Sequence, residues 1–117
     1  MPAATSDHRL DHTHAVERVL RTAGFMILAR VYASARLYDV AATRPDIGPV
    51  LARCVLRATA KDVSEANEMV KAGDFAFALV VSAQPVPKIV DDTSHGVACT
   101  FGNLRDALSR ASNGRVH

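Results

Sequence analysis

Apolar and polar positions in the first half of the chain change from a helical period to a strand period. Apolar residues spaced by three and four predict a helix over 11–23. The runs 25–32 and 36–43 are rich in β-branched and aromatic residues and are separated by a short small-residue segment, so they predict an antiparallel hairpin. The sequence RPDIGP at 44–49 predicts a turn, and the apolar run 50–57 predicts a third strand.

The second half of the chain alternates between helical and strand patterns. Asp62 is expected to cap a second helix with Glu65 as its capping-box partner, and Gly73 to end that helix. The nearly all-apolar run 75–82 is typical of a central strand that is covered on both faces. The remaining elements are expected at 88–94 (a helix), 97–101 (a strand) and 104–111 (a helix capped by Asn103).

The resulting element order is α-β-β-β-α-β-α-β-α, which predicts the α/β class with a mixed central sheet flanked by helices. The first three strands form a meander, whereas the later strands are joined by helical crossovers and should be parallel. We expect a single domain over 11–112, a flexible N-terminal segment over 1–10 and a flexible tail over 113–117.

The composition is typical of a globular protein with a small excess of basic residues. Of the 117 residues, 49% are hydrophobic and 22% are charged, and the formal net charge is only +2. Eleven of the fourteen basic residues are arginine, the better bidentate phosphate binder, but an Ala- and Arg-rich chain with few lysines more often reflects a GC-rich coding genome. No apolar run reaches the length of a membrane span and no secretory signal begins the sequence, so we expect a cytoplasmic protein without a membrane partner.

The cysteines and histidines do not form a recognised metal motif. Cys54 and Cys99 lie in apolar runs without a paired-cysteine spacing, which favours buried free thiols over a zinc site. A reactive Cys54 thiol beside Arg53 is the alternative. A polar N-terminal cluster can in principle bind a transition metal, but a plain polar lead-in is the simpler interpretation; its members are Asp7, His8, Asp11, His12 and His14.

Several segments, taken in order, resemble the restriction-endonuclease-like superfamily of PD-(D/E)xK nucleases, which includes Mrr-type enzymes and archaeal Holliday junction resolvases. The first helix with Glu17 and RTAGF is similar to the family's opening helix, and LYDVAA is similar to its aspartate-bearing second strand. The stretch VLARCVLRATAKDVSEANEMV resembles the third strand and the following helix. The resemblance covers almost the whole chain, and it implies a mixed sheet between helices and nuclease chemistry.

The resemblance also implies where a nuclease would keep its catalytic residues. In the family, an aspartate of the second strand and a glutamate of the third hold a divalent metal, and a lysine two residues further polarises water and phosphate. Asp39 matches the aspartate of the second strand and Glu17 the glutamate of the family's opening helix, but Arg53 and Val55 stand where the family has Glu-x-Lys. A guanidinium there repels Mg²⁺, so the resemblance implies a degenerate active site, and we expect Asp39 to pair with Arg53 across neighbouring strands.

The arginines of the predicted strands supply a candidate nucleic-acid site. Arg53 and Arg57, four apart on the third strand, share one face with each other, and the hairpin adds Arg30 and Arg36 to a possible DNA-binding cleft. Glu17 has a simpler role as an i,i+4 partner of Arg21. The leading hypothesis is a catalytically degenerate nuclease-fold protein, not an enzyme, that binds nucleic acid or assists DNA processing without a cofactor.

Two alternatives remain open. The first is an active metal-dependent endonuclease or resolvase that binds Mg²⁺ through migrated ligands Glu17, Asp39 and Asp46. The second is a structural or regulatory module that touches no nucleic acid and dimerises through its sheet edge or its helices. A DNA-processing partner protein belongs to the leading hypothesis, in which the chain can also be a subunit of a DNA-processing assembly.

Overall fold

The computed structural model describes residues 14–34 and 37–113. For residues 32–34 and 37 it describes the backbone alone. The expected N-terminal segment, most of the expected tail and the metal cluster apart from His14 therefore lie outside the described residues. The same holds for the side chain of Arg36.

The first half of the chain is an N-terminal helix followed by an antiparallel meander. The helix covers 14–22, and Gly24, with a left-handed φ of 93°, turns the chain into the sheet. Strand β1 (Met26–Ser34) pairs antiparallel with β2 (Leu37–Arg44), and β2 pairs antiparallel with β3 (Gly48–Val55). The predicted hairpin and third strand are confirmed.

The second half adds two parallel strands through helical crossovers. Strand β4 pairs parallel with β3, and β5 pairs parallel with β4, which gives the sheet order β1-β2-β3-β4-β5. The predicted α/β class with a mixed sheet is confirmed. The elements are α2 (Ala60–Lys71), β4 (Phe77–Ser82), α3 (Lys88–Ser94), β5 (Ala98–Thr100), a 3₁₀ turn η1 (Phe101–Asn103) and α4 (Leu104–Asn113).

Some local predictions were wrong. Thr59, not Asp62, is the N-cap of α2, and Asp62 takes the third helical position of a complete capping box. Strand β3 ends at Val55, so Arg57 lies in the bend after the strand and does not share a strand face with Arg53. Asn103 ends the 3₁₀ turn η1 that precedes α4.

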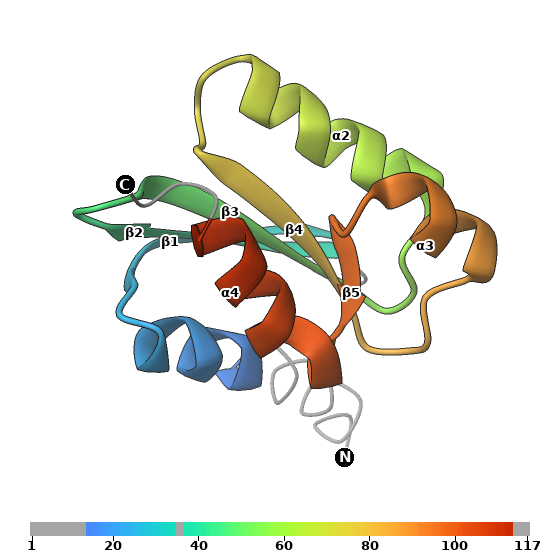
Figure 1. Ribbon diagram of the computed structural model, residues 1–117, viewed down its shortest axis with the longest axis horizontal. Coiled ribbons are helices and arrows are strands. Elements are labelled where there is room, and N and C mark those ends of the chain that lie inside the picture. Colours follow the sequence, from blue (N-terminus) through green and yellow to red (C-terminus); the bar gives the residue numbers. More distant parts are fainter. Residues whose placement is uncertain (1–13, 35–36, 114–117) are drawn as a thin grey trace.

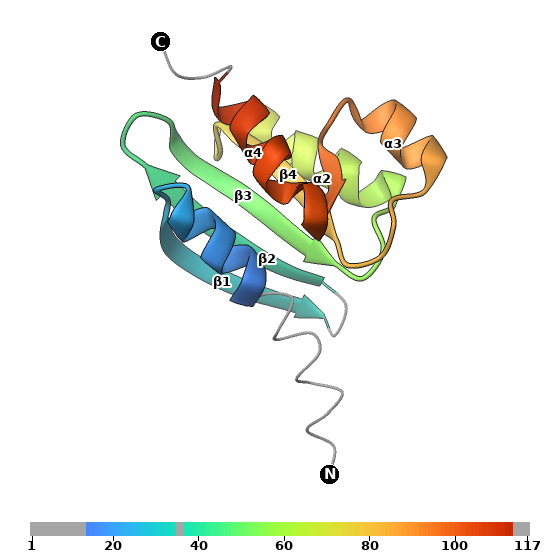
Figure 2. The same cartoon turned by 60° about the horizontal axis from the view of Figure 1, so that its bottom comes forward.

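The sheet separates two apolar core layers. On one face the N-terminal helix and α4 pack over a core that includes Val16, Leu20, Val40 and Leu104 (Figures 1 and 2). On the other face α2 and α3 pack over a second core that includes Leu51, Val63, Val80 and Val90. Because side chains alternate along a strand, neighbouring residues of β3 and β4 enter different cores.

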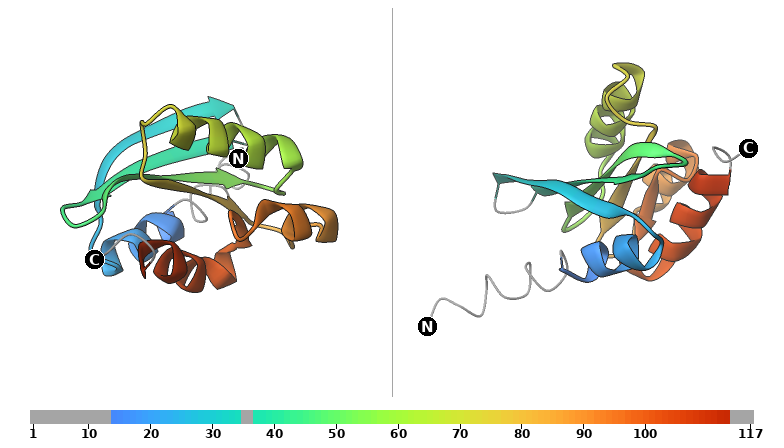
Figure 3. Two further views of the ribbon diagram at one scale, coloured as in Figure 1. Left: turned by 45° about the horizontal axis from the view of Figure 1, so that its top comes forward. Right: turned by 90° about the vertical axis from the view of Figure 1, so that its left-hand side faces the viewer.

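Among the described residues, no helix covers β1 and β2 on the α2 side of the sheet. Helix α2 packs on β4 and β3, and in the edge-on view of Figure 3 the strands β1 and β2 project beyond it. The helices among the described residues are too short and too polar to cross a membrane.

Candidate functional site

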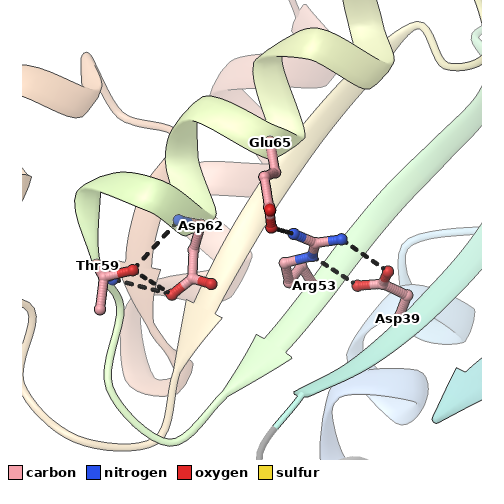
Figure 4. Close-up of polar contacts among 5 residues, drawn as sticks. All are labelled: Asp39, Arg53, Thr59, Asp62 and Glu65. Carbon is pink, nitrogen blue, oxygen red and sulfur yellow. Dashed lines mark hydrogen bonds and ion pairs between the residues drawn. The ribbon is translucent and has the colours of Figure 1, made fainter. Parts of the chain in front are cut away.

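The centre of the candidate site is Arg53, a charged side chain in the middle of β3 that is only 6% exposed. Its guanidinium donates two hydrogen bonds to the Asp39 carboxylate, from Nε to Oδ1 at 2.9 Å and from Nη2 to Oδ2 at 3.0 Å (Figure 4). Nη1 donates a third bond to Oε1 of Glu65 at 2.6 Å. We call Asp39, Arg53 and Glu65 the ionic triad. The Asp39–Arg53 pair that the sequence predicts is confirmed.

Backbone geometry brings these three side chains together. Asp39 and Arg53 face each other in the β2–β3 register, so their side chains leave the same face of the sheet. That face is the one covered by α2, because Leu51 and Val55, two residues before and after Arg53, belong to the α2 core. The Thr59–Asp62 capping box fixes the start of α2 and thereby places Glu65 above Arg53 (Figure 4).

The electrostatics of the triad favour a fixed, charged arrangement. The hydrogen bonds that Arg53 donates to Asp39, and the negative charge of that carboxylate, raise the pKa of the Arg53 guanidinium, which stays protonated. Two carboxylates surround one cation, and Glu65, whose side chain is 44% exposed, remains in contact with solvent. Three of the five N–H groups of Arg53 are thus directed to protein carboxylates.

Val55, which the sequence resemblance aligned with a lysine, is an aliphatic core residue. Its side chain is buried at 5% exposure in the α2 core. The strand that resembles the catalytic strand of a nuclease therefore presents a paired arginine and an aliphatic core residue toward α2.

Glu17 forms a second ionic cluster on the opposite face of the sheet. Arg30 donates two hydrogen bonds to its carboxylate, at 2.6 and 2.7 Å, and Tyr38 donates one from its hydroxyl at 3.3 Å. The predicted ion pair with Arg21 is present at 3.4 Å but is the longer contact. The hydrogen bond from Arg30 is the main cause that lowers the pKa of Glu17, against the burial of the side chain.

The structure does not bring the alternative metal ligands together. Glu17 contacts Tyr38, the neighbour of Asp39 on β2, so the two carboxylates lie on opposite faces of the sheet. Asp46 lies in the β2–β3 turn, where it accepts two hydrogen bonds from Arg44 at 2.6 and 2.8 Å. Within residues 14–34 and 37–113, no three His, Cys, Asp or Glu side chains are grouped so that they could hold a metal ion.

The cysteines behave as core residues. Both thiols are buried and free. Desolvation by burial raises the pKa of Cys54 to about 12 and that of Cys99 to about 11. Cys54 lies in the core under the N-terminal helix, on the other face of β3 from the Arg53 side chain. The alternative of a thiol activated by Arg53 was therefore wrong.

Of the four arginines proposed for DNA binding, Arg36 lies outside the described residues and the other three do not line one cleft. Arg30 binds Glu17 on the N-terminal-helix face, whereas Arg53 binds carboxylates on the α2 face. Arg57 is exposed beyond the end of β3. That these arginines bind nucleic acid stays a prediction. At Arg53, a phosphate group would have to compete with the carboxylates of Asp39 and Glu65 for the guanidinium.

A separation of charge between the two helix layers was missed by the sequence reasoning. The N-terminal helix and α4 carry four arginines and two acids, and one of these acids, Glu17, is buried. Helices α2 and α3 carry three lysines and five acids. The net charge of +2 conceals this asymmetry, which becomes visible only when the helices are assigned to faces of the sheet.

Comparisons with protein-family models, with curated proteins and with solved structures found no match to this chain. The family resemblance therefore stays a prediction from the sequence.

If the triad is structural, Arg53→Met should lower the free energy of unfolding by about 3–5 kcal/mol, because it leaves the largely buried Asp39 without its cation. The double variant Arg53→Met/Asp39→Leu should recover most of that loss, since an apolar pair replaces the ion pair. Urea unfolding measures both.

The matched control is Lys71→Met, which removes an ion pair of 4.0 Å between highly exposed side chains and should change stability by less than about 0.5 kcal/mol. An Arg53→Met protein as stable as the parent would contradict the structural role of the triad.

The lowered pKa of Glu17 predicts a pH-dependent contribution to stability. The contribution is present above the unfolded value of about 4.5 and is lost as the pH falls through the lower folded pKa. Glu17→Gln should therefore be less stable than the parent by roughly 2 kcal/mol at pH 7, and the gap should narrow below pH 4.5. Urea titrations between pH 3 and 7 test this, with the exposed Glu68→Gln as control. A gap of constant size over this range would refute the assignment.

Proposed function

We propose that this chain is a non-catalytic protein with a nuclease-like fold that binds nucleic acid and serves an accessory role in DNA processing. The observation that carries the proposal is the ionic triad, which is centred on Arg53 of β3. At the position where the resembled family binds a metal ion, Arg53 holds Asp39 and Glu65 in a salt-bridge network. A cation fixed between two carboxylates opposes the binding of Mg²⁺ by electrostatic repulsion.

The N-terminal helix and α4 together form a basic helix layer, which supports phosphate binding. Arg18, Arg105 and Arg110 are exposed, and no hydrogen bond or ion pair holds their guanidinium groups within the described part of the chain. They project from the N-terminal helix and from α4, which lie side by side on one face of the sheet (Figures 1 and 2). Contacts of this kind, from arginine to phosphate, supply non-specific nucleic-acid affinity. The proposal therefore shifts the main DNA contacts from the strands to this helix layer.

Mobility-shift titrations of duplex DNA at several salt concentrations test the binding. The triple variant Arg18→Ala/Arg105→Ala/Arg110→Ala should weaken binding more than about tenfold and reduce the salt slope by up to about 3, because each phosphate contact contributes about 0.9. The matched control, Lys61→Ala/Lys71→Ala/Lys88→Ala on α2 and α3, should bind about as well as the parent, because it removes the same charge from the other side of the sheet. Absence of binding by the parent protein at low salt would overturn the proposal.

A cleavage assay in the same samples separates the proposal from the nuclease alternative. With Mg²⁺ or Mn²⁺, plasmid and four-way junction DNA should stay intact. Cleavage that disappears in Asp39→Asn would instead support a working nuclease.

A second candidate function, self-association, rests on the edge strand β1. Among the described strands β1 pairs only with β2, and it exposes Met26, Leu28 and Val31 at 63, 54 and 56%. Such an edge can add a strand from another chain. The proposed occupant is β1 of a second copy, paired antiparallel, because the single charge in this strand, Arg30, is already bound to Glu17 and so opposes self-pairing little.

Sedimentation velocity at micromolar concentrations tests this candidate. The parent chain should form a dimer, and Val31→Lys should shift it to monomer, because it places like charges on the paired edges. The control Ile89→Lys replaces an equally apolar side chain on α3, 73% exposed, and should remain dimeric. A parent protein that is monomeric throughout would exclude this function.

A further inference from the structure

A groove of about 240 Å³ lies between α4, the end of the N-terminal helix and the end of β2. Arg105, Ser109 and Ser112 enter it from one face of α4, since they are spaced by four and three residues. Arg44 enters it from β2, and Ala23 lines the opposite wall. The groove lies on the basic side of the sheet and is distinct from the ionic triad, which faces α2.

Arg44 supplies a guanidinium that is fixed in place and still has free donors. Its Nε and Nη2 each donate a hydrogen bond to Asp46, and its Nη1 donates one to the carbonyl oxygen of Ala23 at 3.0 Å. The guanidinium also stacks over the ring of Phe25, 5.3 Å from its centroid. A guanidinium has five N–H groups, so two remain for a ligand.

Arg105 supplies the net positive charge of the groove. Asp46 neutralises Arg44, whereas Arg105 has no hydrogen-bond or ion-pair partner within residues 14–34 and 37–113. An anion that enters the groove therefore meets one unpaired cation and one preoriented cation.

Ser112 is a second and independent sign of a ligand. Its side chain is buried at 6% exposure and lines the groove, yet no hydrogen bond of its hydroxyl is formed within the described part of the chain. Buried hydroxyls are ordinarily hydrogen-bonded, because an unsatisfied one costs free energy. A ligand oxygen in the groove satisfies this hydroxyl.

We propose that the groove binds a phosphate group, whose oxygens accept hydrogen bonds from Arg44, Arg105 and the hydroxyl of Ser112. A tetrahedral anion with several acceptors suits two guanidinium groups and one hydroxyl. That this phosphate belongs to a nucleic acid rests on the proposed function; the phosphate site itself does not.

Inorganic phosphate, titrated at constant ionic strength with chloride as reference and followed by ¹⁵N NMR, tests the site. We expect saturable shifts at Arg105, Ser109 and Ser112, at least a tenfold loss of affinity in Arg105→Gln, and weaker binding in Ser112→Ala. Arg18→Gln, an exposed arginine outside the groove, should leave phosphate affinity unchanged. Shifts that do not saturate, or that are spread equally over all arginines, overturn the site.

Measuring DNA binding of the same variants identifies the source of the phosphate. Arg18→Gln should weaken DNA binding only, whereas Arg105→Gln should weaken both DNA and phosphate binding. Tighter binding of a 5′-phosphorylated oligonucleotide than of its unphosphorylated counterpart assigns the groove to a terminal phosphate, and equal binding assigns it to the backbone. DNA binding without phosphate binding overturns this inference alone, and phosphate binding without DNA binding overturns the proposed function alone.

Discussion

The bidentate salt bridge between Arg53 and Asp39 is the interaction on which the rest of this account depends. It joins β2 to β3, and the third bond to Glu65 joins both strands to α2. A guanidinium at 6% exposure is tolerated in a β-sheet only when carboxylates compensate it. The same bonds occupy the carboxylates of Asp39 and Glu65, which are therefore already paired with a cation. Under the proposed function, this pairing also accounts for a lack of nuclease chemistry.

Strand alternation is the second constraint. Side chains change faces at every residue of β2, so Tyr38 points to the N-terminal helix while Asp39 points to α2. Glu17 and Asp39 are thereby held apart by the thickness of the sheet. The sheet also divides the helices into a basic and an acidic layer, which gives the molecule two electrostatically different sides. A polyanion is attracted to only one of them.

Much of the fold was predictable because it depends on local patterns. The order of helices and strands, the hairpin and the bounds of α3 follow from periodicity and turn residues. The Asp39–Arg53 pair was predictable because opposite charges stood in strands that were expected to be neighbours. The cap of α2 was misplaced by three residues because both Thr59 and Asp62 are good cap residues, and sequence alone does not say which one takes the extended conformation.

The rest required the packing of distant elements. The bond between Glu17 and Arg30 depends on how the N-terminal helix crosses β1, and no spacing in the sequence encodes that distance. Glu65 was assigned to capping, although α2 carries it over Arg53. Arg57 was placed on a strand that ends two residues earlier. The groove beside Ser112 combines residues from α4, β2 and the end of the N-terminal helix, which are brought together only by the tertiary fold.

The central claim is that Arg53 occupies the carboxylates of β2 and α2 and leaves them unavailable to a divalent metal. A titration with Mn²⁺, followed by paramagnetic broadening of amide signals, measures this directly. If Arg53 holds both carboxylates, no selective broadening is expected at Asp39 and Glu65 at micromolar Mn²⁺, with only weak effects at exposed acids such as Asp91 and Asp92. Saturable broadening centred on Asp39 and Glu65 would contradict it.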